Sequence, residues 1–251
     1  MRNYIKSEFY RIIHRRYYHL SVLIYIVLSI IGNLTLKFWG TKITTNLFLT
    51  SMKSLTITIV VSPFVLYSFQ DIVLGDELKH NTLNNSVAIG ISRSKIILSK
   101  IITTATVSML FSIIVILVHI LMSVALFGVN EEGIRSISQY FIAYLSAIPL
   151  WMGFIAFYNV FCTIIQNQVI AGITIFTLAF ITPKVTQLIT YFKPKLSIIH
   201  ELQPYSVLKR LIKLLDMKNI SSIDWFTVCF GLGFFIISTS VAIIGFRKRD
   251  F

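Results

Sequence analysis

The side chains that could carry out acid–base chemistry begin with Glu131, Glu132 and Arg135, two acids followed closely by a base. Such a group could activate water for peptide hydrolysis only if a fixed, desolvated site shifted its pKa values. The trio falls in a short polar stretch between two long apolar runs, where a hydrated loop is expected. We therefore expect no proteolytic activity from these residues.

Nucleotide and redox chemistry also lack a sequence signature. The chain contains no G-x-x-x-x-G-K-[ST] motif, whose backbone amides and Lys would hold nucleotide phosphates. Cys162 and Cys229 both lie in apolar runs, which indicates small buried hydrophobic residues and not a metal or redox pair. We expect no catalytic residue, no bound cofactor and no metal site, so the chain is not an enzyme by itself.

One ionisable side chain, His119, lies in the middle of an apolar run. Such a residue at membrane depth is a candidate for a transport path. A neutral His that is hydrogen-bonded to a neighbouring Ser or Thr hydroxyl would also explain it. Both interpretations stay open at the level of the sequence.

The composition decides the class of protein. The 251 residues are 55% hydrophobic and only 13% charged, which excludes a soluble enzyme because a water-exposed surface needs more polar side chains. The net charge of +13 suits nucleic acid or anionic lipid. Hydrophobicity favours lipid, so we expect a membrane partner and no nucleic acid.

Membrane spans are predicted where Asp, Glu, Lys and Arg are absent. The charge-free run 136–183 is too long for one crossing, because about 20 helical residues cross about 30 Å of hydrocarbon, so we divide it at Gln166, Asn167 and Gln168. This predicts one all-α integral membrane domain over residues 1–251. Its six spans lie near residues 20–36, 54–74, 103–127, 139–163, 169–191 and 224–246.

Both chain ends are basic, which by the positive-inside rule favours cytoplasmic termini. Residues 1–19 also show helical periodicity, and we expect an interfacial helix there, although a basic topological anchor would look similar. The side chains expected at the membrane interface are Ile5, Phe9, Ile12 and Ile13 on the apolar side and Arg11 and Arg15 on the polar side.

The most polar segment, residues 75–100, joins the second and third spans. Asp76 is expected to cap a helix of about three turns that ends at Gly90, and Ser92 to cap the next helix. That second helix carries Arg93 and Lys100 and continues without a break into the third span. The pattern predicts a stiff connection through which force on the short helix would reach the membrane.

This segment resembles the cytoplasmic loop of permease subunits in the type-2 ABC exporter family. In such loops an acidic residue, a small turn residue with Thr, an apolar residue, Gly, Ser-Arg and a later Lys recur. The matching positions are Glu77, Asn81 with Thr82, Leu83, Gly90, Ser92 with Arg93, and Lys100. Asn81 departs from the pattern, since it stands where the family has Gly.

The resemblance implies a half-transporter whose cytoplasmic coupling helix docks onto a separate P-loop ATPase. It further implies two ATPase copies that bind ATP and Mg, and a second permease subunit that is identical or paralogous. The residues that this carries over to the ATPase interface are Glu77, Thr82, Leu83, Gly90, Ser92 and Arg93.

Residues 193–222 are predicted to form a short amphipathic insertion between the last two spans. After Pro204, apolar residues recur at helical spacing in 208–215, with cations on the other side. We place this insertion on the external surface. The resemblance implies short helices that dip into the outer leaflet.

Substrate and source rest on resemblance and composition. An Ile-, Lys- and Asn-rich chain suggests a bacterial plasma-membrane protein, and small bacterial permeases similar to it act in export of, or immunity to, amphipathic antimicrobial peptides. The alternative is a stand-alone secondary transporter or membrane sensor without an ATPase. Against it, the sequence shows no pair of Gly/Pro-broken half-helices and no intramembrane acid or Lys cluster for ion coupling.

Overall fold

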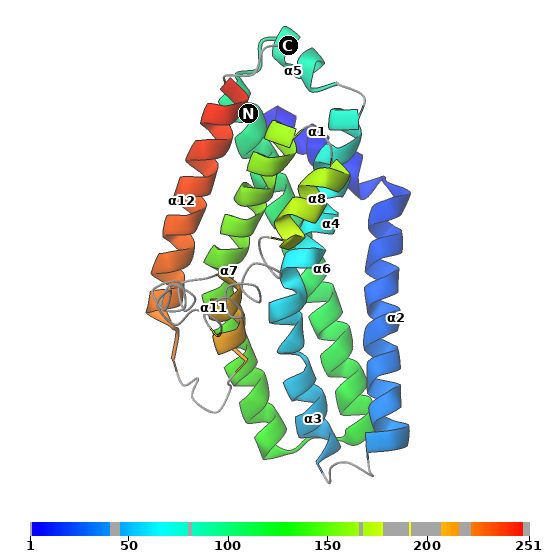
Figure 1. The fold of residues 1–251 in the computed structure, drawn as a ribbon. Helices are drawn as coiled ribbons and strands as arrows, with labels where there is room; N and C mark the ends of the chain where they lie inside the picture. Colours follow the sequence, from blue (N-terminus) through cyan, green and yellow to red (C-terminus); the bar gives the residue numbers. More distant parts are fainter. Residues whose placement is uncertain are drawn as a thin grey trace.

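The computed structural model describes residues 2–40, 46–79, 82–165, 168–177, 191, 207–215 and 222–247, and every regular element within them is a helix (Figure 1). In chain order, the elements are α1 (Arg2–Ile13), α2 (Arg16–Trp39), α3 (Leu47–Ser54), α4 (Ile57–Lys79), α5 (Leu83–Ala88), α6 (Arg93–Phe127), α7 (Glu131–Ile165), α8 (Gln168–Phe176), α11 (Val207–Lys213) and α12 (Trp225–Arg247).

Five helical segments in the described part of the chain are long and apolar enough to cross a membrane: Arg16–Trp39, Leu47–Gly75, Arg93–Phe127, Glu131–Cys162 and Trp225–Phe246. These five candidate spans overlap five of the six predicted ones. The first starts four residues earlier than expected, because Arg15 is extended and the helix resumes at Arg16. The predicted span 169–191 is described only at α8 and residues 177 and 191, so the sixth crossing stays a prediction.

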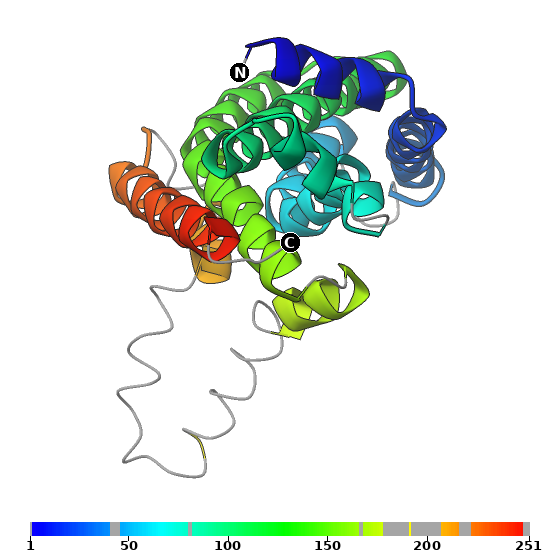
Figure 2. The same cartoon turned by 90° about the horizontal axis from the view of Figure 1, so that it is seen from above.

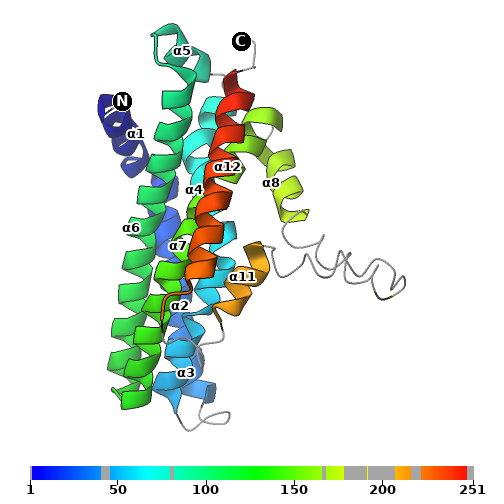
Figure 3. The ribbon, with the colours of Figure 1, turned by 90° about the vertical axis from the view of Figure 1, so that its left-hand side faces the viewer.

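The long helices form one bundle (Figures 1 and 3). α2 packs along α6, α4 packs against both α6 and α7, and α12 runs along α7. α1 lies across one end of this bundle, as the view along the helices shows (Figure 2). Much of the outer surface of α2 is apolar and exposed, which suits contact with lipid.

The α7–α12 pair approaches closely at Gly231. A Cβ atom there would lie 2.6 Å from the backbone nitrogen of Leu150, so only glycine fits without displacement. Small residues at helix crossings let backbones approach, and in a bilayer such packing is a main source of helix association. This contact fixes α12 against the centre of α7.

Pro63 lies inside α4, where its missing N–H would leave the carbonyl of Ile59 unsatisfied. The Ser62 hydroxyl donates to that carbonyl at 2.6 Å. Tyr158 of α7 donates its hydroxyl to the Pro63 carbonyl, also at 2.6 Å. The proline is therefore accommodated by side chains, and α4 continues as one helix to Lys79.

Candidate functional site

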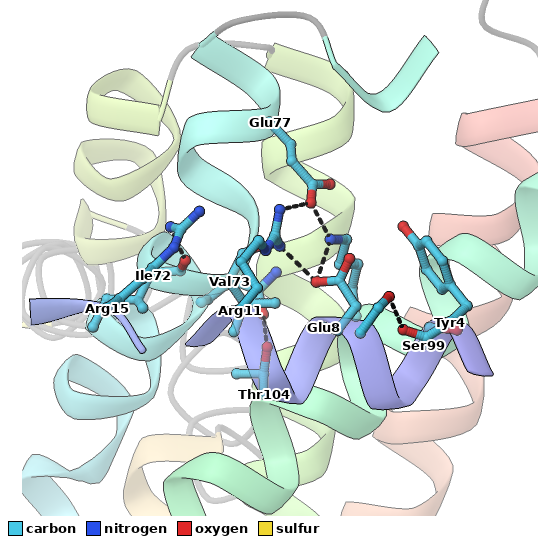
Figure 4. Close-up of polar contacts among 12 residues, drawn as sticks. Tyr4, Glu8, Arg11, Arg15, Ile72, Val73, Glu77, Ser99 and Thr104 are labelled. Atoms are coloured by element: carbon cyan, nitrogen blue, oxygen red, sulfur yellow. Dashed lines mark hydrogen bonds and ion pairs between the residues drawn. The ribbon is translucent and has the colours of Figure 1, made fainter. Parts of the chain in front are cut away.

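Four charged side chains join α1, α4 and α6 at the α5 end of the bundle, and we call them the charge cluster: Glu8, Arg11, Glu77 and Lys100 (Figure 4). The Lys100 Nζ lies 2.6 Å from Glu77 Oε1 and 2.8 Å from Glu8 Oε2. Arg11 also contacts both acids, with its Nη2 2.5 Å from Glu8 Oε2 and its Nη1 bonded to Glu77 Oε1. Each acid is thus held by both bases.

The acids and the lysine of the charge cluster are buried. Lys100 is fully buried, and Glu8 and Glu77 are 5% and 7% exposed. Two acids and two bases leave no net formal charge, and this balance is what makes the burial tolerable, since an unpaired buried ion costs several kcal/mol. The charges therefore balance only when α1, α4 and α6 are packed against one another.

Tyr4 covers the cluster from α1. The Lys100 Nζ lies 5.8 Å from the centre of its ring, in the range of a cation–π contact. Burial raises the pKa of Tyr4 to about 12, so its phenol stays protonated at neutral pH. An uncharged ring over the Lys leaves the charge balance unchanged.

Two arginines, Arg11 of α1 and Arg15 between α1 and α2, also bond to the backbone of α4 (Figure 4). Arg11 Nη2 donates to the carbonyl of Val73 at 2.8 Å, and Arg15 Nη1 donates to the carbonyl of Ile72 at 2.6 Å. A carbonyl oxygen in a helix can accept such a second bond because it has two lone pairs. Arg11 and Arg15 therefore hold α1 and its junction with α2 against α4.

This placement revises the predicted faces of α1. The predicted polar side, with Arg11 and Arg15, faces α4, and these two cations do not simply reach outward to lipid headgroups. Of the predicted apolar side, Ile12 is fully buried, Ile5 and Phe9 are half-buried, and Ile13 is 45% exposed. Periodicity alone missed this because Glu8, which neutralises the cations, occupies the centre of the buried face.

The segment after the charge cluster is a compact tip, which we define as residues 82–92 (Figures 1 and 3). It contains the six-residue helix α5, which begins at Leu83 and not at Asp76 as expected. Asp76 lies inside α4, whose last turns also carry Glu77 and its two ion pairs. Asn81 lies outside the described residues.

Gly90 lies just after the end of α5. Its φ is +89°, a conformation that strongly favours glycine. Its N–H donates to the carbonyl of Val87 at 2.9 Å, and the N–H of Ile91 donates to the carbonyl of Ser86 at 3.2 Å. These two bonds form a Schellman motif, which closes α5 and turns the chain into α6.

The other predicted interface residues occupy different positions in the tip and at the start of α6. Thr82 and Ser92 are exposed, while Leu83 is 2% exposed and belongs to the apolar core. Arg93 donates from Nη1 to the carbonyl of Phe246 at the end of α12, at 3.3 Å. The predicted continuous helix from Arg93 into the third span is observed as α6.

Sequence reasoning missed three features of this region. Glu8 completes the charge cluster, and Lys100 is buried there and paired with two acids. Ile89 is 81% exposed at the tip, which is unusual for a large apolar side chain in a polar segment. Its signal in the sequence is an apolar residue directly before the turn glycine.

His119 lies at the opposite end of α6, in what we call the neutral polar cluster: Asn33 of α2, Ser51 of α3, and His119 and Ser123 of α6. Ser51 and Ser123 donate their hydroxyls to Asn33 Oδ1 at 2.6 and 2.8 Å. His119 Nδ1 lies 3.3 Å from Asn33 Nδ2 and its Nε2 3.2 Å from the carbonyl of Ser51. These are the contacts of a His held by hydroxyl and amide neighbours, and a transport role for it stays a prediction.

The predicted external insertion is described only at residues 207–215 and 222, where α11 spans Val207–Lys213. Leu211 and Leu214 are buried, and Lys213 Nζ lies 3.3 Å from Asp224 Oδ2 just before α12. The remaining residues of 193–222 lie outside the described part of the chain.

Together these features define a multispanning helical membrane protein with an exposed polar tip anchored through buried ions to its long helices. The sequence profile of the ABC-2 family transporter proteins matches residues 4–184, which is more than half of the chain, and the chain belongs to this family. A search of curated proteins returned no match. Membership in this family indicates a permease of an ABC transporter and implies an ATPase partner in general.

Proposed function

We propose that this chain is the membrane-spanning permease subunit of an ATP-driven exporter whose ATP is hydrolysed by a separate P-loop ATPase. The functional unit contains two ATPase copies and a second permease, identical or paralogous. ATP and Mg bind on the partner, and this chain supplies no catalytic group. The match of residues 4–184 to the family, which includes the charge cluster and the tip, supports this assignment.

The observation that carries the proposal is the mechanical connection of the tip. The tip, residues 82–92, lies in the chain between α4, which ends at Lys79, and α6, which begins at Arg93. Beneath the tip, the Glu77–Lys100 ion pair joins these two helices at 2.6 Å. Arg11 ties α1 to the same acid. A push on the tip would therefore be transmitted to α1, α4 and α6 as one unit.

The surface that would receive the ATPase is the outer side of the tip. Thr82, Asn85, Ile89 and Ser92 are exposed there. Ile89 gives this polar surface one large apolar side chain, the kind of residue that fills a pocket on a partner. Glu77 and Leu83 support the tip from below, since both are buried.

The arrangement of the ends supports cytoplasmic termini. The start of α1, the tip and the end of α12 all lie at the same end of the bundle (Figures 1 and 3). If the tip meets a cytoplasmic ATPase, both chain ends face the cytoplasm. We place the protein in a bacterial plasma membrane and assign as substrate an amphipathic antimicrobial peptide.

The assembly test is affinity purification of the tagged permease in mild detergent from its native cells. Substituting Ile89→Asp should reduce the recovered P-loop ATPase about tenfold or more, because it places a charge where an apolar contact is expected. Val129→Asp is the matched control, since Val129 is 58% exposed at the opposite end of the bundle. Equal ATPase recovery with both variants, or none with the unchanged protein, contradicts the proposal.

The substrate is tested separately, by the survival of cells exposed to an amphipathic cationic peptide. Cells with the permease and its ATPase should survive higher peptide concentrations than cells with Ile89→Asp. Equal sensitivity, with the ATPase still recovered on the unchanged permease, would reject the peptide and leave the exporter assignment standing.

A further inference from the structure

The outward side of α1 carries cations that the charge cluster does not use. Of the basic side chains in α1 and at the start of α2, Arg11 and Arg15 bond inward to α4. The others, which we call the outer cations, are exposed: Arg2, Lys6 and Arg16. None of these three side chains has a hydrogen bond or ion pair within the described part of the chain.

No acid on this side balances the outer cations. Glu8 is the one acid between residues 2 and 70 of the sequence, and it is 5% exposed because it points into the charge cluster. Arg2 and Arg16 also begin α1 and α2, where the helix dipole disfavours a cation, and neither helix has an acid in its first turn. The outer cations therefore do not stabilise the fold, and an anion from outside the chain would compensate their charge.

The position of α1 puts these cations at the membrane surface. The first candidate span begins at Arg16, so α1 precedes the apolar segment of the chain. α1 lies across the end of the bundle and forms part of its edge in the view along the helices (Figure 2). The phosphate groups of a bilayer lie at this level, just outside the hydrocarbon core.

Exposed aromatic and apolar side chains accompany the outer cations. Tyr10 follows Lys6 by four residues, which puts the two on one face of α1, and Tyr17 follows Arg16; Tyr10 is 67% exposed and Tyr17 73%. Leu20, 53% exposed, then begins the apolar outer surface of α2. Tyrosine is enriched where a membrane meets water, so this order matches phosphate, glycerol and acyl chain.

We propose that the outward side of α1 binds the headgroups of acidic phospholipids, with the outer cations at the phosphates and Tyr10 and Tyr17 at the glycerol level. The occupant is a bilayer lipid and not a soluble anion, because the apolar surface of α2 continues directly from these cations. Arg11 joins the inward side of α1 to Glu77, so a lipid bound outside also holds α1 in its docked position. This binding does not depend on the ATPase assignment.

The test uses the full chain in phosphatidylcholine vesicles that contain a small amount of one photoactivatable lipid. The two probes are a phosphatidylglycerol and a phosphatidylcholine with the same diazirine beside the glycerol, and mass spectrometry locates the label. Residues 2–20 should be labelled about fivefold or more strongly by the phosphatidylglycerol, since each cation near the surface favours an acidic lipid. Raising the salt concentration from about 0.05 M to about 0.5 M should lower this preference, because exposed charges are screened.

A triple variant identifies the residues that select the acidic lipid. Arg2→Gln, Lys6→Gln and Arg16→Gln together should reduce labelling by the phosphatidylglycerol to that by the phosphatidylcholine. The matched control changes three exposed cations toward the opposite end of the bundle and should leave the preference unchanged: Lys37→Gln, Lys53→Gln and Arg135→Gln. If the triple variant aggregates on size-exclusion chromatography, Lys6→Glu alone replaces it, with a loss of preference expected.

Hydrogen exchange tests whether the lipid holds α1 in place. Residues 4–13 should exchange more slowly in vesicles with phosphatidylglycerol than in phosphatidylcholine alone, and the triple variant should lose this difference. Equal labelling of the unchanged protein by the two probes would leave only a basic anchor that sets topology, and would overturn the proposal. An equal loss in the control variant, or displacement of the phosphatidylglycerol label by an equimolar soluble acidic peptide, would also overturn it.

Discussion

Two buried clusters of polar side chains attach α6 to its neighbours, and they differ in charge. The charge cluster joins α6 to α1 and α4, and the neutral polar cluster joins α6 to α2 and α3. The first joins two acids to two bases at the α5 end, and the second joins an amide, two hydroxyls and an imidazole toward the α3 end. In both clusters the central residue is fully buried, since Lys100 and Asn33 are each 0% exposed.

The difference follows from what each position can supply. At the α5 end, α1 lies across the bundle and brings Glu8 and Arg11 to Glu77 and Lys100, so every ion has a counter-ion (Figures 2 and 4). Farther into the bundle, an ion without counter-ions would lower stability by several kcal/mol, so neutral groups are used there. Each hydrogen bond between neutral groups in membrane helices adds about 0.6 kcal/mol of stability on average. At the base of the tip, each ion therefore depends on its counter-ions for its burial.

The largest effect is expected from Lys100→Met. Glu8 and Glu77 then stay buried with only Arg11 to neutralise them, which should lower the free energy of unfolding by about 3–5 kcal/mol. Denaturant unfolding of the purified protein in detergent measures it. Lys95→Met, on an exposed residue of the same helix, is the control and should change stability by less than about 0.5 kcal/mol.

The stability lost in Lys100→Met should come from the unequal number of buried acids and bases, and not from the loss of an ion as such. The double variant Glu77→Gln and Lys100→Met leaves one acid and one base, Glu8 and Arg11, 2.5 Å apart. It should recover most of the stability lost in Lys100→Met, since replacing a buried ion pair is often close to neutral. A double variant as unstable as the single one would contradict the role of charge balance.

A smaller effect is expected from Asn33→Ala in the neutral polar cluster. Ser51, Ser123 and His119 lose one shared partner but keep other hydrogen bonds, so the free energy of unfolding should fall by about 1–2 kcal/mol. Thr35→Ala, an exposed position on the same helix, is the control. A loss as large as that of Lys100→Met would remove the distinction between the two clusters.

The smallest effect is expected from Gly90→Ala, which tests the tip above the charge cluster. At φ +89° an alanine costs about 1 kcal/mol, and an added Cβ meets no atom within 4 Å, so the cost is conformational alone. Hydrogen exchange should rise in residues 83–91 and stay unchanged in α6. Gly90→Asn should be milder, because Asn tolerates positive φ better.

The sequence predicted much of the fold because lipid imposes simple rules. Charge-free runs placed five of the spans, and the unbroken pattern from Arg93 predicted α6 as one long helix. The turn at Gly90 was also predictable, since glycine is the residue that most readily adopts positive φ. The resemblance pointed to Glu77 and Arg93 but not to their contacts.

The contacts that form the candidate site were beyond sequence reasoning. Arg11 and Glu77 are separated by 66 residues, and nothing in their local patterns shows that they meet. Glu8 has the appearance of a solvated residue on a basic helix, and Lys100 that of a cytoplasmic charge under the positive-inside rule. Both are buried because α1 lies across α4 and α6.

By itself, the sequence determined that this chain is helical, membrane-embedded and without a nucleotide motif, because hydropathy and missing motifs are local properties. Only the tertiary structure decided which charges are buried together and which side of α1 faces the bundle. These properties depend on side chains from several helices, and burial and pairing energies exist only once those helices have packed.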